Sequence, residues 1–469
     1  MNKYETLVDR LREQIAANIW QVGDKLPSLR EQAVYSGMSL MTVMHAYQIL
    51  ESQGWIISRP QSGYYIAPKA EFLTTPATHQ QVQPAEQVDI NAFIFDVLQA
   101  SRDQSIVPFG SAFPDPSLFP RQQLARSLTT VARSMTPLSA VDNLPPGNED
   151  LRNTIAKRYA LQGMQISPEE IVITAGAMES LNLSLQAVTE PGDWVIVENP
   201  AFYGALQALE RLKLKAVAIA THPQFGIDLD ALENALAAYP VKACWVMTNS
   251  HNPLGCTLSD EKKRQLVALL QQYRVHLIED DVYSELYFGA DKPLPAKAYD
   301  RLGMAMHCSS FSKNLVAGFR VGWVAAGEMA GKIQRLQLMT TLSTSAPMQL
   351  ALANYLATRS YDRHLRRLRR LLEQRKNSAW QSLHAHLPPA ARINYSHSGY
   401  FLWIELPAHI SATELYHRAL RQKISIAPGK MFSAGGQYNN YFRFNTSYAW
   451  DERYERAVIA LTDIIKQMM

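Results

Sequence analysis

The sequence predicts a protein of the α/β class, with a mostly parallel sheet covered by helices on both faces and a small helical domain ahead of it. Three observations support this prediction. The chain has 469 residues, more than one ordinary hydrophobic core accommodates. From about residue 89 onward, short apolar runs alternate with helical stretches, as buried strands of a parallel sheet do. Residues 1–67 show mainly helical periodicity instead.

Composition and charge fit a folded protein in a reducing compartment. Apolar residues make up 47% and charged residues 19%, and the formal charge of +4 does not by itself indicate a nucleic-acid partner. The cysteines lie far apart without a CxxC pair or a His/Cys cluster, so we expect no metal site. The N-terminus lacks an apolar signal segment, and no run of 18 apolar residues occurs. We therefore expect a cytoplasmic protein without a membrane partner.

The first 67 residues have the pattern of a winged helix. A first helix is predicted by an apolar face of Tyr4, Leu7, Val8, Leu11 and Ile15. Ser28 and Glu31 form an S-x-x-E capping box that opens a second helix, which Gly37 ends. Ser39 caps a third helix, closed by Gly54, whose inward face is Val43, Ala46, Tyr47 and Leu50. The alternating segment around Ser62 and Gly63 predicts a hairpin, which completes the winged helix-turn-helix.

The rest of the chain divides into a linker and a large domain. Residues 68–88 lose periodicity and gain Pro, Thr and Gln, so we interpret them as a semi-extended linker. Residues 89–469 form the α/β domain. After about residue 345 the chain becomes helical, and "GYFLWIELP" and "NYFRFNTSY" predict two further strands. We expect residues from about 345 to 469, with part of 89–130, to form a smaller α+β subdomain.

One lysine and one arginine stand out in the stretch "HCSSFSKNLVAGFRVGW". Lys313 lies among small hydroxyl residues and apolar flanks, where a dry site and a nearby positive charge lower the pKa of an amine enough for Schiff-base chemistry. Arg320 either supplies that charge or binds a phosphate dianion. The turn Gly176-Ala177-Met178 leads from a strand into a helix, whose free N–H groups form an anion site.

Two more strand ends supply polar groups. "EDDVY" presents Asp280 and Tyr283, and "NSHNPLG" presents Asn252. A buried carboxylate holds a pyridinium nitrogen protonated, and a phenol bonds a ring oxygen. Ligands bind beyond the carboxyl ends of strands in such sheets, where these residues gather with Lys313. A lysine, an anion cradle, a carboxylate and a polar ring contact together indicate pyridoxal 5′-phosphate.

The ordered motifs "NPAFYG", "NSHNPLG", "EDDVYSEL", "SSFSK…GFRVGW", "SGYFLWIEL" and "FRFN" resemble a fold-type I aminotransferase over roughly residues 105–467. The segment "GDKLPSLREQA" and the residues that follow it resemble a GntR-type winged helix. A fusion of the two is similar to the MocR subfamily of bacterial regulators, and particularly to its enterobacterial members. The resemblance implies a fold-type I pyridoxal-phosphate-dependent transferase fold behind the DNA-binding domain.

The resemblance also implies residue roles. Lys313 would hold the cofactor as an internal aldimine, Asp280 would partner the pyridine nitrogen, and Tyr283 and Asn252 would contact the ring hydroxyl. Phe202 would stack on the ring, with Tyr203 as a competitor. The residues implied for the phosphate are Gly176, Ala177, Ser310 and Arg320, with Ser312 as a further candidate. Arg443 would bind a substrate carboxylate.

Some implied roles have rivals. Asp280, Arg320 and Arg443 also have purely structural interpretations, as a cap, an ion-pair partner and a strand-surface residue. The family usually has a tyrosine that contacts the phosphate across the dimer where this chain has Asp142. That departure puts the cross-subunit contact in doubt.

The DNA-facing residues follow from the winged-helix pattern. Met41, Thr42 and His45 lie on the outer face of the third helix, where side chains reach the major groove. Arg30 and Ser39 lie at helix N-termini suited to phosphate contacts, and Gly63 forms the wing tip. The first 69 residues carry seven Lys or Arg against six Asp or Glu, which is a weak electrostatic footprint. We interpret the arginine-rich run 363–376 as a solvated helix face rather than a second DNA surface.

Taken with the resemblance, these features predict a transcription regulator. Its aminotransferase-like domain would sense pyridoxal phosphate, an amino compound or both through aldimine chemistry, and so control binding to a double-stranded DNA operator. The resemblance implies a homodimer, with heads swapped head-to-tail, and an operator with two half-sites. Two alternatives stay open: a competent aminotransferase with an autoregulatory DNA-binding head, and a sensor of the cofactor alone.

Overall fold

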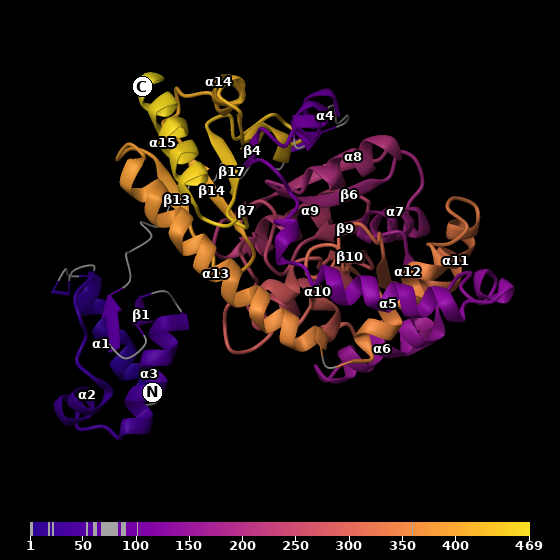
Figure 1. Ribbon diagram of the computed structural model, residues 1–469, viewed down its shortest axis with the longest axis horizontal. Helices are drawn as coiled ribbons and strands as arrows, with labels where there is room; N and C mark the ends of the chain where they lie inside the picture. The colour runs from indigo at the N-terminus through magenta and orange to yellow at the C-terminus, as the bar shows by residue number, and fades with distance from the viewer. Residues whose placement is uncertain are drawn as a thin grey trace. The chain divides into compact units, whose positions relative to one another are not determined.

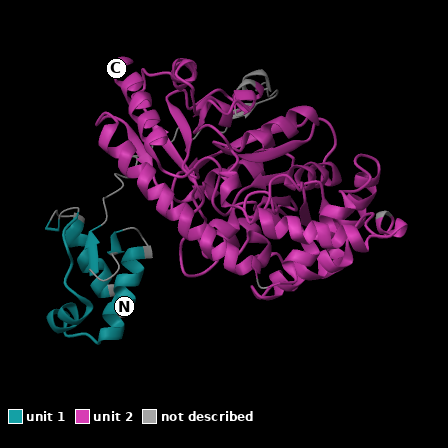
Figure 2. Cartoon of the chain, viewed as in Figure 1, with its two compact units in different colours: residues 1–74 teal, residues 75–469 magenta. Residues whose placement is uncertain are grey.

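In a computed structural model the chain forms two compact units, residues 1–74 and residues 75–469 (Figures 1 and 2). The structure describes residues 3–16, 19–20, 23–52, 55–59, 63–66, 83–85, 91–100, 102–358 and 360–469. The predicted domain boundaries after residues 67 and 88 fall outside these ranges and stay predictions. In the part of the chain that is described, no helix has the length and apolar character needed to cross a bilayer.

The first unit has the predicted order of helix, helix-turn-helix and hairpin. Its elements are α1 (Lys3–Ala16), α2 (Leu29–Ser36), α3 (Leu40–Ser52), β1 (Ile56–Arg59) and β2 (Gly63–Ile66). The two strands pair antiparallel. Their core joins the predicted helix faces to the hairpin, through Leu7, Val8, Leu11, Ile15, Val43, Ala46, Tyr47, Leu50, Ile56 and Ile66. The winged-helix prediction is therefore confirmed.

Local capping explains where the short helix α2 begins and ends. The Ser28 hydroxyl accepts from the Glu31 N–H, and the Glu31 carboxylate accepts from the Ser28 N–H at 2.8 Å. Gly37 ends the helix with a φ of 65°, a left-handed conformation that glycine adopts without strain. The predicted closure of α3 by Gly54 lies outside the described residues.

A large sheet organises the second unit (Figure 1). Its strand order is β3-β7-β6-β9-β10-β11-β12-β5, with β8 paired to β7. Strands β7, β6, β9, β10 and β11 run parallel, and β12 is antiparallel to both of its neighbours. The strands are β3 (Gln83–Ala85), β5 (Ile171–Thr174), β6 (Trp194–Asn199), β7 (Lys215–His222), β8 (Gly226–Ile227), β9 (Val241–Val246), β10 (His276–Asp280), β11 (Ala305–Ser310) and β12 (Gly322–Ala325).

Two features of this sheet differ from the sequence prediction. Residues 83–85, which we assigned to the linker, form β3 and pair antiparallel with β7. Residues 83–85 are therefore held by backbone hydrogen bonds to the large sheet. Strands β7 and β12 were not singled out, although β12 connects β5 to the parallel part of the sheet.

Helices cover both faces of the sheet, as predicted. Along β6, Val195 and Val197 belong to a core cluster with α7 and α8, while Ile196 between them belongs to a cluster with α9 and α10. This alternation places the two clusters on opposite faces. The helices of this region are α5 (Arg121–Ser134), α6 (Glu149–Ala160), α7 (Ala177–Val188), α8 (Tyr203–Arg211), α9 (Leu229–Ala238), α10 (Asp260–Gln272), α11 (Ala330–Leu338) and α12 (Ala346–Leu356).

A smaller subdomain contains a four-stranded sheet of order β13-β14-β17-β16. Its elements are α13 (Ser360–His386), β13 (Arg392–Asn394), β14 (Phe401–Glu405), α14 (Ala412–Arg421), β15 (Ile424–Ser425), β16 (Ala427–Pro428), β17 (Tyr441–Asn445) and α15 (Glu452–Gln467). An earlier segment joins it: β4 (Val107–Pro108) pairs with β15, and Ile94 and Val97 of α4 (Asn91–Ala100) enter the same core. The chain thus contributes the edge strand β3 to the large sheet, then passes through the small subdomain, and only afterwards forms the other strands of the large sheet.

Candidate functional site

The candidate residues of the second unit meet at one edge of the large sheet. Asp280 ends β10, Lys313 follows β11, and Asn252 follows β9. Gly176 follows β5, which runs parallel to β11 because both are antiparallel to β12. All four residues therefore lie beyond carboxyl ends of strands that point the same way, which is where α/β sheets bind ligands.

Lys313 is half-buried in an environment that favours its neutral form. Its Nζ donates to the carbonyl of Ala112 at 2.9 Å and lies 4.4 Å from the centroid of the Phe113 ring. Burial, and then the charges of Arg443 and Arg320, lower the pKa of the amine to about 7, while Asp280 opposes the shift. An amine with that pKa is substantially unprotonated at neutral pH, which is what nucleophilic attack requires.

Asp280 is 1% exposed, and its Oδ1 has no hydrogen-bond partner among the described residues. Burial and the neighbouring Asp281 raise the pKa of this carboxyl to about 7. An unpartnered buried carboxylate oxygen is costly unless a ligand completes it. A protonated ring nitrogen is a group that would do so.

Arg443 lies deep in the site beside Asn252 and Tyr283. Its Nη1 donates to the Asn252 Oδ1 at 2.8 Å, and the Asn252 Nδ2 lies 3.5 Å from the Tyr283 hydroxyl. Arg443 is 1% exposed, its Nε has no partner, and no carboxylate of the described chain forms an ion pair with it. Burial lowers the pKa of the guanidinium. A buried cation without a counter-ion suits an anionic ligand group.

A segment that the sequence did not single out, Gly110–Phe113, crosses the site. The Gly110 carbonyl accepts from Arg443 Nη2 at 2.9 Å, and the Ala112 carbonyl accepts from both Lys313 and the Tyr400 hydroxyl. The Asn445 side chain donates to the carbonyls of Ser111 and Phe113. We call this segment the strap. Its backbone carbonyls accept one hydrogen bond from Lys313 and one from Arg443.

The start of α7 forms a cradle with Arg320. Gly176 precedes the helix with a φ of 91°, and a Cβ there would lie 2.5 Å from Arg320 Nη2. Arg320 Nη1 donates to the Ser312 hydroxyl at 3.4 Å, and the Ser310 hydroxyl accepts from the Ser312 N–H at 3.3 Å. The N–H groups of Ala177 and Met178 lie in the first turn of α7, where no helix carbonyl is in reach. A guanidinium beside such a helix start suits a phosphate.

The two aromatic candidates differ in their surroundings. Tyr203 is buried, and its ring packs within the core of the small subdomain. Phe202 is half-buried at the start of α8, and a Cβ on Gly204 would lie 2.4 Å from its ring and 3.1 Å from the Met178 sulfur. Phe202 and Met178 therefore flank one narrow space near the cradle. Of the two aromatic candidates, Phe202 has the more accessible ring.

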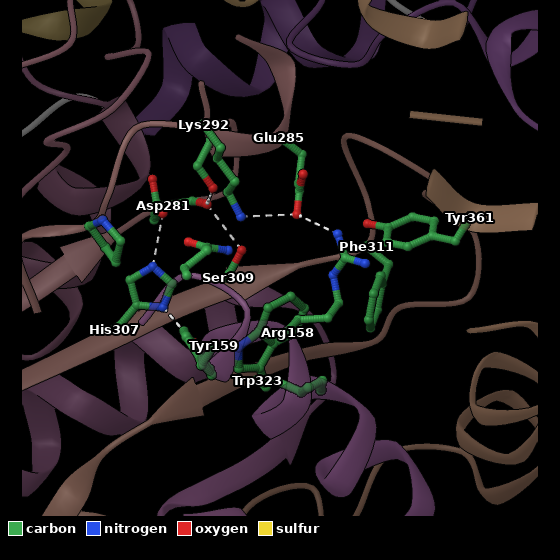
Figure 3. A pocket seen from close by; sticks show the side chains of 14 residues that line it. Arg158, Tyr159, Asp281, Glu285, Lys292, His307, Ser309, Phe311, Trp323 and Tyr361 are labelled. Carbon is green, nitrogen blue, oxygen red and sulfur yellow. Dashed lines mark hydrogen bonds and ion pairs between the residues drawn. The ribbon is translucent and has the colours of Figure 1, made fainter. Parts of the chain in front are cut away.

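Behind this edge, Asp281 belongs to a buried hydrogen-bonded chain (Figure 3). His307 Nε2 lies 2.9 Å from the Asp281 carboxylate, and Nδ1 lies 2.7 Å from the Tyr159 hydroxyl. The Trp323 indole donates to that hydroxyl at 2.9 Å. Because a carboxylate only accepts, Nε2 carries the proton and donates it to Asp281, and Nδ1 of the neutral imidazole then accepts from the Tyr159 hydroxyl. This hydrogen-bonded chain fixes the orientation of the Asp281 carboxylate, next to Asp280.

The cavity in Figure 3 is not the ligand site. It has a volume of about 40 Å³, room for about three water molecules. Its charged groups pair with one another: Glu285 lies 3.2 Å from Arg158 and 3.0 Å from Lys292. No group of three His, Cys, Asp or Glu side chains suited to a metal occurs in the described residues.

Four of the six DNA-facing candidates of the first unit are exposed, and Thr42 and Gly63 are half-buried. Arg30 and His45 are exposed, and Met41 on α3 is 66% exposed. The Ser39 hydroxyl accepts from the Thr42 N–H at 3.2 Å and lies 2.8 Å from the Thr42 hydroxyl, so these two candidates partner each other. Gly63 begins β2 with a φ of 106°, and the wing residues 60–62 before it lie outside the described chain.

Comparisons with known proteins match both units. The family of bacterial regulatory proteins called gntR matches residues 3–66, and aminotransferase class I and II matches residues 141–461. The chain therefore belongs to the GntR-type transcription regulators that carry a class I and II aminotransferase domain, the MocR-type architecture. Members of that aminotransferase class typically bind pyridoxal phosphate.

Individual relatives agree with this family. The chain is 66% identical to the HTH-type transcriptional regulator YdcR of Escherichia coli K12, over all of both chains. It is 34% identical to YjiR of the same organism, again over all of both chains. Among solved structures, a kynurenine aminotransferase of Pyrococcus horikoshii in complex with PMP has a TM-score of 0.75 at 25% identity, covering 81% of this chain and 95% of that one.

Proposed function

We propose that this regulator holds pyridoxal 5′-phosphate on Lys313 and responds to a small amino compound that binds beside it. One observation carries the proposal: Lys313, with a pKa of about 7, and Asp280, with a buried carboxylate oxygen that has no hydrogen-bond partner, lie at the same edge of the sheet. When bound, the cofactor supplies an aldehyde that reacts with primary amines.

Each part of the site has one task in this proposal. Arg320 and the first turn of α7 bind the phosphate, and Asp280 accepts a hydrogen bond from the protonated ring nitrogen. Tyr283 and Asn252 contact the ring hydroxyl. The unpartnered Asp280 oxygen and the Gly176 position, where a Cβ would meet Arg320, support this fit. The ring of Phe113 and the Ala112 carbonyl cover part of the amine.

Arg443 defines the chemical class of the effector. The guanidinium carbon of Arg443 lies 4.3 Å from the centroid of the Phe401 ring and 5.2 Å from that of Phe432. A buried guanidinium without a carboxylate partner favours an amine that also carries an acid group. The winged helix binds the operator. We further propose a homodimer with swapped heads that reads two half-sites, as the family resemblance implies.

An absorbance scan of purified protein tests the proposal. The wild type with added pyridoxal phosphate is expected to show the visible band of a lysine-bound cofactor, and Lys313→Ala is expected to lose it. Lys332→Ala, on the exposed face of α11, is the matched control and keeps the band. An undiminished band in Lys313→Ala contradicts the assignment of Lys313.

The catalytic alternative is separated by turnover. Sustained transamination of amino-acid and keto-acid pairs at about 1 s⁻¹ or faster marks an enzyme. A spectral change with an amino acid but no turnover marks the regulator. DNA binding that responds to pyridoxal phosphate alone marks a sensor of the cofactor. Arg443→Ala is expected to weaken the response to carboxylated amines and leave the cofactor bound.

A further inference from the structure

The long helix α13, which runs along the outside of the second unit, carries two kinds of arginine (Figure 1). Two of them are anchored to the protein. The Arg369 guanidinium carbon lies 4.2 Å from the Tyr287 ring centroid, and Arg375 forms an ion pair with Asp115 at 2.9 Å. The other four are exposed, and we call them the arginine face: Arg363, Arg366, Arg367 and Arg370.

The arginine face is a continuous stripe on one side of the helix. Its members stand at positions i, i+3, i+4 and i+7, which share a face and span roughly 10 Å of the axis. No hydrogen bond, ion pair or ring contact involves any of the four among the described residues. The nearest acid in sequence, Asp362, is paired with Arg158 at 3.0 Å.

Some exposed bases on other helices of the same unit are paired with acids of their own helix. On α14, Arg418 lies 2.8 Å from Glu414, and on α15, Lys466 lies 3.6 Å from Asp463. The arginine face instead sets like charges one turn apart on a 27-residue helix, and like charges at this spacing repel one another. The exposure of these arginines agrees with our interpretation of residues 363–376 as a solvated face, and their shared charge also suits an anionic partner.

The DNA-binding unit carries little positive charge of its own for contacts with phosphates. Its first 69 residues carry a net charge of +1, seven bases less six acids, although winged helices bind a polyanion. We propose that the arginine face binds the phosphate backbone of DNA, as a second contact besides the winged helix. This inference rests on the chain being a DNA-binding regulator.

The geometry suits a phosphate strand. Phosphates of one strand repeat every 3.4 Å along the duplex axis, so roughly 10 Å of helix spans about three of them. Arginine forks bind phosphate oxygens with two parallel hydrogen bonds. Such contacts carry no sequence preference, so the arginine face adds affinity and salt dependence and leaves the choice of operator to the head.

The test compares two full-length variants that lose the same charge. The first changes the arginine face to glutamine at all four positions. The control changes four exposed bases that are scattered over the second unit and have no ion-pair partner among the described residues: Lys242→Gln, Arg274→Gln, Arg301→Gln and Arg421→Gln. Binding to a random-sequence DNA duplex is measured for both, and for the wild type, from about 50 to 200 mM salt.

Loss of three phosphate contacts is expected to make the slope of log K against log salt less negative by about 2.7, at roughly 0.9 per contact. It is also expected to weaken binding more than tenfold at low salt. The control is expected to keep most of the wild-type slope. Equal slopes in both variants, or an unchanged slope in the first, overturn the inference and leave the regulator proposal standing. A wild type that binds no duplex of any sequence overturns both.

Discussion

The pKa of Lys313 makes cofactor capture steeply dependent on pH near neutrality. Only the neutral amine attacks an aldehyde. With a pKa of about 7 rather than 10.5, about half of the amine is neutral at pH 7, against about 0.03% for an ordinary lysine. That is roughly a 1,600-fold gain in the reactive form. Because the shift is downward, the neutral fraction falls as the pH falls, from about 91% at pH 8 to about 9% at pH 6.

The assay follows the visible band after apoprotein is mixed with pyridoxal phosphate, across that pH range. The rate is expected to rise about tenfold from pH 6 to 8, with a midpoint near 7. Arg320→Gln removes one of the charges that depress this pKa, so its midpoint is expected to move upward. A wild-type rate that keeps rising to a midpoint near 10 would refute the argument, because Lys313 would then behave as a solvated lysine.

Three further predictions concern other parts of the molecule. Asp280→Asn is expected to weaken pyridoxal-phosphate binding about tenfold or more, measured by equilibrium dialysis, because an amide does not complete the charge of a pyridinium; unchanged affinity would show that Asp280 faces no ring nitrogen. Gly176→Ala pushes a methyl group against Arg320 and should also weaken cofactor binding at least tenfold, whereas Gly163→Ala, at a similar φ of 78° but in open space, is the control and should not. Ser28→Ala removes the N-cap of α2 and should lower the unfolding free energy of the head by about 1 kcal/mol; thermal melts with equal midpoints would contradict it.

The parts of the fold set by local chemistry were predictable from the sequence. The Ser28 capping box, the Gly37 end and the apolar face around Tyr47 each depend on residues close together in the chain, and each is confirmed. The parallel strands were predictable because they are apolar on both faces. Strand β3 was not, because its pairing with β7 is a long-range backbone contact in a polar, proline-containing segment.

The site shows the same division. The strand ends at Asp280 and Lys313 were visible because polar residues follow apolar runs. The strap was not, since its role depends on backbone carbonyls, which have no sequence signature, and its partners Tyr400 and Asn445 lie more than 280 residues away in the chain. The same holds for His307 on β11, whose partner Tyr159 lies on α6, far away in the chain.

The strap turns ligand recognition at Arg443 into an exchange. The guanidinium already donates to the Gly110 carbonyl and to Asn252, so an arriving acid group does not meet a bare cation. Its net gain is the difference between a charge-assisted bond to a carboxylate and the neutral bonds given up. Under the proposed function, such an exchange is expected to give moderate affinity and ready reversal.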